Sequence, residues 1–262
     1  MNKILKLNDF IKYIVFFILL GLFINTLQIH RESEINTVLD LYIRSYSMIY
    51  IQGLLDNIMN LIRWLIVHIS LILIMYDYIS QYFLRFGTLI FTRTNKRISF
   101  LKSRCIELFV LIFIFYFIQF LTSIVIGKIN ENALELGNLV ITLKAILVLS
   151  LYQFWILLII NLLCLVFNDR ASIMIILFVE IGTLLFIKFF INIGIVFGKW
   201  SQLIPTIDSF IITNPDNPYM ILNSHLKYSY NFSIIYLGIL ILITFIIGCL
   251  FIKKIDLLED KE

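Results

Sequence analysis

The chain has 262 residues, of which 61% are hydrophobic, and its mean hydropathy is +0.97. Soluble domains contain roughly 45–50% apolar residues, so this composition excludes an ordinary soluble protein and predicts an integral membrane protein. The net charge of +4 does not indicate nucleic-acid binding, because Lys and Arg cluster at the ends of apolar runs, where they act as orientation signals.

Six apolar segments are long enough to cross a bilayer, since a spanning helix needs about 20 apolar residues. Backbone N–H and C=O groups must be satisfied inside lipid, which makes each segment a helix. The first segment is interpreted as an uncleaved anchor, because no small-residue cleavage site follows its long apolar run. We therefore expect one all-α transmembrane domain over residues 1–262. Its predicted spans are about 12–28, 58–80, 106–127, 139–166, 172–198 and 233–252.

The two longest segments outside these spans differ in character. Segment 29–57 contains apolar residues at helical spacing, namely Ile35, Val38, Leu39 and Tyr42. This spacing predicts an amphipathic helix on the outer surface. Segment 199–232 is polar and interrupted by prolines, so it is not expected to span. Its stretch "LIPTIDSFII" is nevertheless apolar enough to fold back against the bundle.

The distribution of cations sets the predicted orientation. With six spans, thirteen of the 21 Lys and Arg residues share the side of the N-terminus, five lie on the other side and three fall within spans. Both termini are therefore expected in the cytoplasm. The basic segment 81–105 then becomes the main cytoplasmic loop. The short stretch "NDRAS" at 168–172 becomes a tight cytoplasmic turn between the fourth and fifth spans.

The sequence contains no recognisable catalytic or metal-binding motif. Cys105, Cys164 and Cys249 fall near the cytoplasmic ends of spans three, four and six, and none has a CxxC partner. We interpret them as packing residues, and we expect no metal ion and no cofactor. Gly194 and Gly198 form a small-xxx-small pair that would let another helix approach closely, against the alternative that both glycines are incidental.

Charged and polar side chains inside the spans are the remaining candidates, since charge in hydrocarbon is costly. Arg63, Lys144 and Lys188 lie toward the outer ends, where anchoring by snorkelling is favoured over a substrate role. Glu180 and His68 are expected about 12 and about 15 Å inside the bilayer, from opposite sides, so their depths nearly meet. One hypothesis pairs Glu180 with His68. The default alternative is a protonated Glu180 that is hydrogen-bonded elsewhere in the bundle.

The layout of these segments resembles the permease subunit of type-2 ABC exporters. The shared features are a basic N-terminus, six spans with both ends inside, a basic loop between spans two and three, a tight loop between four and five, and a longer outer segment before span six. The stretch "YFLRFGTLIFTRTNKRISFLKSR" is similar to the basic coupling segment of small bacterial permeases of this family, some of which serve peptide export or bacteriocin self-protection.

The resemblance implies a transport subunit, not an enzyme, in the bacterial cytoplasmic membrane. Its partners would be a separate ABC ATPase subunit, a second permease subunit in a homodimer or heterodimer, and membrane lipid. The residues that it suggests for coupling to the ATPase are Arg85, Arg93, Lys96, Arg97, Asp169 and Arg170. The alternative is a membrane-embedded enzyme or assembly factor in which Glu180, His68 and Lys188 do chemistry within the bundle.

Overall fold

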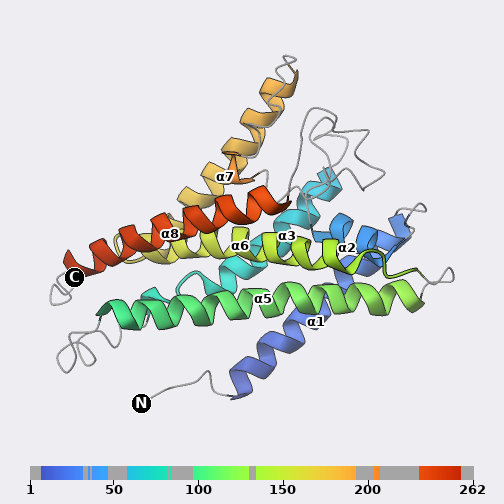
Figure 1. Ribbon diagram of the computed structural model, residues 1–262, viewed down its shortest axis with the longest axis horizontal. Coiled ribbons are helices and arrows are strands. Elements are labelled where there is room, and N and C mark those ends of the chain that lie inside the picture. The colour runs from blue at the N-terminus through green and yellow to red at the C-terminus, as the bar shows by residue number, and fades with distance from the viewer. Residues whose placement is uncertain are drawn as a thin grey trace.

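The computed structural model describes residues 7–31, 35, 37–46, 58–81, 83, 97–129, 134–192, 203–206 and 230–254. The regular elements in these ranges are helices, labelled as in Figure 1: α1 (Leu7–Arg31), α2 (Val38–Tyr46), α3 (Ile58–Met75), α5 (Arg97–Ile129), α6 (Leu139–Leu163), α7 (Asp169–Asn192) and α8 (Tyr230–Lys254).

Four helices within the described residues are long and apolar enough to cross a membrane. They are α1 over Phe10–His30, α5 over Arg97–Ile129, α6 over Leu139–Leu163 and α8 over Tyr230–Ile252. The prediction of an all-α membrane protein is confirmed, and these four helices indicate a chain that crosses the bilayer more than once.

Two helix boundaries correct the predicted loops. Helix α5 begins at Arg97, so residues 97–105, predicted as the end of the basic loop, form its first turns. Lys and Arg are good helix formers, so their charge does not delay the start of the helix. Helix α7 begins at Asp169, which places Asp169 and Arg170 in its first turn and not in a loop. The Asn168 side chain accepts a hydrogen bond from the Ala171 N–H at 2.8 Å and so caps this helix.

The long helices alternate in direction along the chain (Figure 1). Helix α1 runs parallel to α5, because Phe17 packs against Phe115 and, further along both helices, Asn25 bonds to Thr122. Helices α3, α6 and α8 run the opposite way. Their shared direction follows from the pairs His68–Tyr152 and Met75–Asn161 between α3 and α6, and Trp155–Thr244 and Leu162–Gly248 between α6 and α8. The starts of α1, α5 and α7 therefore share one end of the bundle with the ends of α3, α6 and α8.

Helix α2 forms where the sequence predicts a helix, but its predicted place on the surface is wrong. Seven of its nine residues are buried, because α1, α3 and α5 surround it. The Tyr42 ring lies edge-on to Phe120 of α5, with ring centroids 5.8 Å apart. The Val38 N–H donates to the Glu135 carbonyl oxygen at 2.7 Å, which fixes the start of α2 beside the connection between α5 and α6. Helix α2 is thus part of the core of the bundle.

Helices α1 and α5 meet closely at Gly21. A Cβ atom at this position would overlap Gln119 Oε1 and Thr122 Oγ1, so the close approach requires glycine. One turn further along α1, Asn25 Nδ2 donates to the Gly21 carbonyl oxygen at 2.9 Å and to Tyr46 Oη at 2.8 Å. Close helix packing through a small residue is typical of membrane bundles. The glycines predicted for this role, Gly194 and Gly198, lie outside the described residues.

Candidate functional site

A buried histidine–glutamate contact joins two helices in the middle of the bundle. His68 Nε2 on α3 lies 2.8 Å from both carboxylate oxygens of Glu180 on α7. Their side chains are only 3 and 4% exposed. The hypothesis that Glu180 contacts His68 is confirmed. The alternative, in which Glu180 is hydrogen-bonded elsewhere in the bundle, is also partly correct, because Glu180 has a second hydrogen-bond partner.

That second partner is Tyr152 on α6, whose Oη donates to Glu180 Oε1 at 2.7 Å. Tyr152 was not predicted as a partner of Glu180, although the spacing of the two residues in the sequence indicates it. Helices α6 and α7 form a tight hairpin, and residues 152 and 180 lie equally far from Val166 in its turn. Two residues at equal distances from such a turn lie at the same depth. The carboxylate therefore ties together α3, α6 and α7.

Aromatic rings hold the His68 imidazole in place. The ring of Trp64, one turn earlier on α3, stacks on His68 with centroids 4.9 Å apart and an angle of 12° between the planes. The Tyr152 ring lies against His68 at 5.8 Å and 22°. The imidazole is thus confined between two rings, and its Nε2 is directed at the carboxylate. Stacking on these rings restricts the rotation of the imidazole and keeps its Nε2 directed at Glu180.

The polar cluster formed by His68, Tyr152 and Glu180 extends toward the segment before α8. Thr183 Oγ1 donates to the Glu180 carbonyl oxygen at 2.7 Å and lies 2.8 Å from Thr206 Oγ1. Tyr236 Oη on α8 donates to the Leu203 carbonyl oxygen at 2.6 Å. Residues 203–206 therefore pack against α7 and α8, which confirms, for these four residues, the prediction that this stretch folds back against the bundle.

The chemical capacity of the cluster is that of a buried acid with a basic neighbour. A carboxylate between an imidazole and a phenol can hold or exchange a proton, or it can act as a fixed tether. Within the described residues, no group of three His, Cys, Asp or Glu side chains could hold a metal ion. Lys188, the third predicted polar candidate, belongs to α7, but its side chain lies outside the described part of the structure.

Asn161 on α6 closes the end of α3. Its Oδ1 accepts hydrogen bonds from the N–H groups of Ile79 at 2.6 Å and Ser80 at 3.4 Å, and its Nδ2 donates to the Met75 carbonyl oxygen at 3.0 Å. Helix α3 ends at Met75, earlier than the predicted boundary at residue 80, so the N–H groups of Ile79 and Ser80 are no longer part of its backbone hydrogen-bond pattern. The amide replaces the missing partners inside the bundle.

The basic end of α5 is attached to its neighbours. Arg97, its first residue, donates to the Ile252 carbonyl oxygen of α8 at 3.4 Å. Arg104 pairs with Glu107 at 2.5 Å, and Glu107 also accepts from Tyr78 Oη at 3.1 Å. Asp169 and Arg170 lie at this same end of the bundle, as do the three cysteines. The other predicted coupling residues, Arg85, Arg93 and Lys96, lie outside the described residues.

No family model, curated protein or solved structure matches this chain.

Proposed function

We propose that the chain is the membrane-spanning permease subunit of an ABC transporter of the type-2 exporter kind, which exports a peptide or another amphipathic substrate. A separate ATPase subunit would supply the energy, and a second permease subunit would complete the translocation path. The proposal includes six spans, both termini in the cytoplasm and a location in the bacterial cytoplasmic membrane. The alternating directions of the long helices and the cation distribution support this topology.

The length of α5 is the observation that carries the proposal. Its 33 residues extend about 50 Å, whereas the hydrocarbon core of a bilayer is about 30 Å thick. The excess lies at the Arg97 end, where Arg97, Lys102 and Arg104 precede the apolar stretch. A rigid basic helix that projects from the membrane and is joined to α8 can pass motion from a docked partner into two spans at once.

The buried cluster has a supporting role in this proposal. Glu180 connects α7 to α3 and α6, while α7 diverges from α6 away from their hairpin (Figure 1). A polar tether between a diverging helix and the bundle is a suitable pivot for a transport cycle. The second candidate function is a membrane-embedded enzyme or assembly factor. It rests on Glu180, His68 and Tyr152 acting together as a proton-transfer group.

The coupling role of the basic segment can be tested by charge removal. We expect the triple variant Arg93→Gln, Lys96→Gln, Arg97→Gln to insert normally, because Arg85, Lys102 and Arg104 remain to hold orientation. Its recovery of the ATPase in co-purification should fall at least severalfold, and transport should fall with it. The matched control removes three cations from the C-terminal tail, Lys253, Lys254 and Lys261, by the same substitution. ATPase recovery and transport at the parent level in the triple variant would show that the segment is only a topology signal.

The proposed topology can be tested with a pair of single cysteines. We expect Leu139→Cys, at the start of α6, to react in intact cells with a maleimide that cannot cross the membrane. Arg170→Cys, at the start of α7, should react only after permeabilisation, because α6 separates the two positions by one crossing. Both positions are exposed in the structure. Cys249→Ser serves as the background, since Cys105 and Cys164 are buried whereas Cys249 is only half-buried. Labelling of Arg170→Cys from outside would contradict the orientation.

A further inference from the structure

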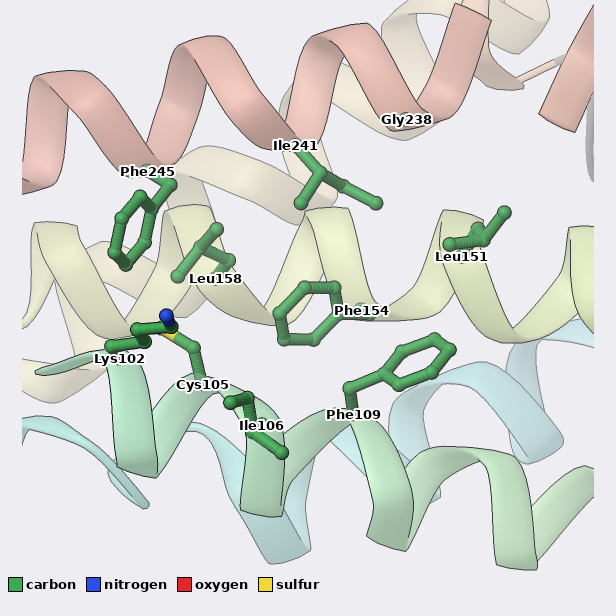
Figure 2. A pocket seen from close by; sticks show the side chains of 10 residues that line it. All are labelled: Lys102, Cys105, Ile106, Phe109, Leu151, Phe154, Leu158, Gly238, Ile241 and Phe245. Atoms are coloured by element: carbon green, nitrogen blue, oxygen red, sulfur yellow. The ribbon is translucent and has the colours of Figure 1, made fainter. Parts of the chain in front are cut away.

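An apolar groove of about 360 Å³ runs between α5 and α8, with α6 as its floor (Figure 2). Its volume falls within the roughly 300–1,000 Å³ of small-molecule sites. Nearly all of its lining is hydrocarbon. The lining residues are Cys105, Ile106 and Phe109 from α5, Leu151, Phe154 and Leu158 from α6, and Gly238, Ile241 and Phe245 from α8, with Lys102 as the one charged member.

Lys102 sits at one end of this groove. Figure 2 shows its side chain reaching from α5 toward the α8 side, near Phe245, while Gly238 and Leu151 lie at the opposite end. The distance along α5 from Lys102 to Phe109, seven residues, is about 10 Å. Lys102 belongs to the basic first turns of α5, so it lies at the level where a bilayer changes from headgroups to hydrocarbon. The groove thus has an apolar lining, with the Lys102 side chain at its rim.

We propose that this groove binds one anionic phospholipid, with an acyl chain against the apolar lining and the phosphate at Lys102. An unfilled groove in a bilayer would leave its lining without dispersion contacts, so a lipid chain is the natural occupant. The headgroup choice follows from charge: basic sites between helices near a membrane surface favour anionic lipids. The two neighbouring cations of α5 have other partners, since Arg97 bonds to Ile252 and Arg104 to Glu107. The inference requires only that the helices cross a membrane, and it does not depend on the transport function.

Gly238 allows the groove to be filled without disturbing the fold. A Cβ atom at Gly238 meets no atom within 4 Å, so Gly238→Leu places its side chain in open space within the groove. Leucine also favours a helix more than glycine does. Gly182 on α7 is the matched control, because a Cβ there also meets nothing within 4 Å and the residue is not among those that line the groove. The third variant, Lys102→Gln, removes the charge alone.

The experiment is native mass spectrometry of the full-length protein in detergent, titrated with phosphatidylglycerol or phosphatidylcholine. We expect the parent and Gly182→Leu to retain one phosphatidylglycerol with about fivefold preference over phosphatidylcholine. Gly238→Leu should lose this tightest adduct at least tenfold. Lys102→Gln should retain both lipids equally, at the level of phosphatidylcholine on the parent. These results together would support the proposal.

Three outcomes would overturn it. Equal retention of phosphatidylglycerol by Gly238→Leu and Gly182→Leu would place the lipid elsewhere. Equal binding of both lipids to the parent, with no effect of Lys102→Gln, would leave an apolar surface without headgroup recognition. If Gly238→Leu changes the fraction of dimer and leaves lipid retention unchanged, the groove receives a second copy of the chain.

Discussion

Glu180→Leu is expected to cause a large loss of stability, because this one side chain satisfies two other buried polar groups. Removing the partner of a buried polar group costs about 1–3 kcal/mol for each group that is left unsatisfied. Here two partners are left, His68 Nε2 and Tyr152 Oη, and both are buried. The hydrogen bonds that join α7 to α3 and α6 through this side chain are lost at the same time. Unfolding in a sodium dodecyl sulfate titration and the Tm in detergent measure this effect.

Glu180→Gln is the informative comparison. The amide keeps an oxygen that accepts from Tyr152 and His68, so we expect a loss of only about 1 kcal/mol, the ordinary contribution of one hydrogen bond. Glu180→Gln should also retain more transport than Glu180→Leu, since a hydrogen-bonding tether tolerates loss of charge better than loss of polarity. Equal loss of transport in both variants, with stability preserved in Glu180→Gln, would instead indicate an essential proton and favour the second candidate function.

A double-mutant cycle separates the contact between His68 and Glu180 from the rest of the site. We expect the loss in the double variant His68→Leu, Glu180→Leu to fall short of the sum of the two single losses by roughly 1–3 kcal/mol, because residues in direct contact couple on that scale. Additive losses would mean that the two side chains stabilise the bundle independently, in contradiction to the 2.8 Å contact.

Asn161→Leu is expected to destabilise the bundle as well. The leucine is close in size, but it leaves the buried Ile79 N–H without its partner. It also removes one of the two donors to the Met75 carbonyl oxygen, which keeps the Tyr78 N–H at 3.3 Å. An unsatisfied buried group costs about 1–3 kcal/mol, so a loss of about 2 kcal/mol in the free energy of unfolding is expected from the Ile79 N–H. Proteolysis near the turn at 76–79 should accelerate as well, because the end of α3 would no longer be held.

Gln153→Leu is the matched control for Asn161→Leu, since it replaces an amide by leucine on the same helix. The Gln153 side chain is fully buried, and neither of its polar atoms has a hydrogen-bond partner in the described structure. Replacing an unsatisfied buried amide by a hydrocarbon should be neutral or stabilising. A loss for Gln153→Leu as large as that for Asn161→Leu would show that bulk at the α6 interface, and not hydrogen bonding, decides the outcome.

The sequence alone determined the class of protein, its helical content and the approximate helices, because these depend on local properties. Hydrocarbon demands a satisfied backbone, and about 20 apolar residues in a row leave only a helix. The rise per residue also gave the depths of His68 and Glu180, and hence the idea of their contact. The sequence could not show whether Glu180 contacts His68 or another partner, because the depth of a residue does not give the direction in which its side chain points around the helix axis.

Only the tertiary structure decided those directions. It placed Tyr152 on the face of α6 that meets α7, and it buried α2, whose composition is equally suited to a membrane surface. It ended α3 at Met75, because an amide from another helix satisfies the freed backbone groups there. It also opened the groove beside Gly238, where glycine leaves space between helices whose sequences are uniformly apolar. In a uniformly apolar chain, few polar residues mark which face of a helix is exposed. The buried faces are therefore decided by the contacts between helices and cannot be predicted from the sequence.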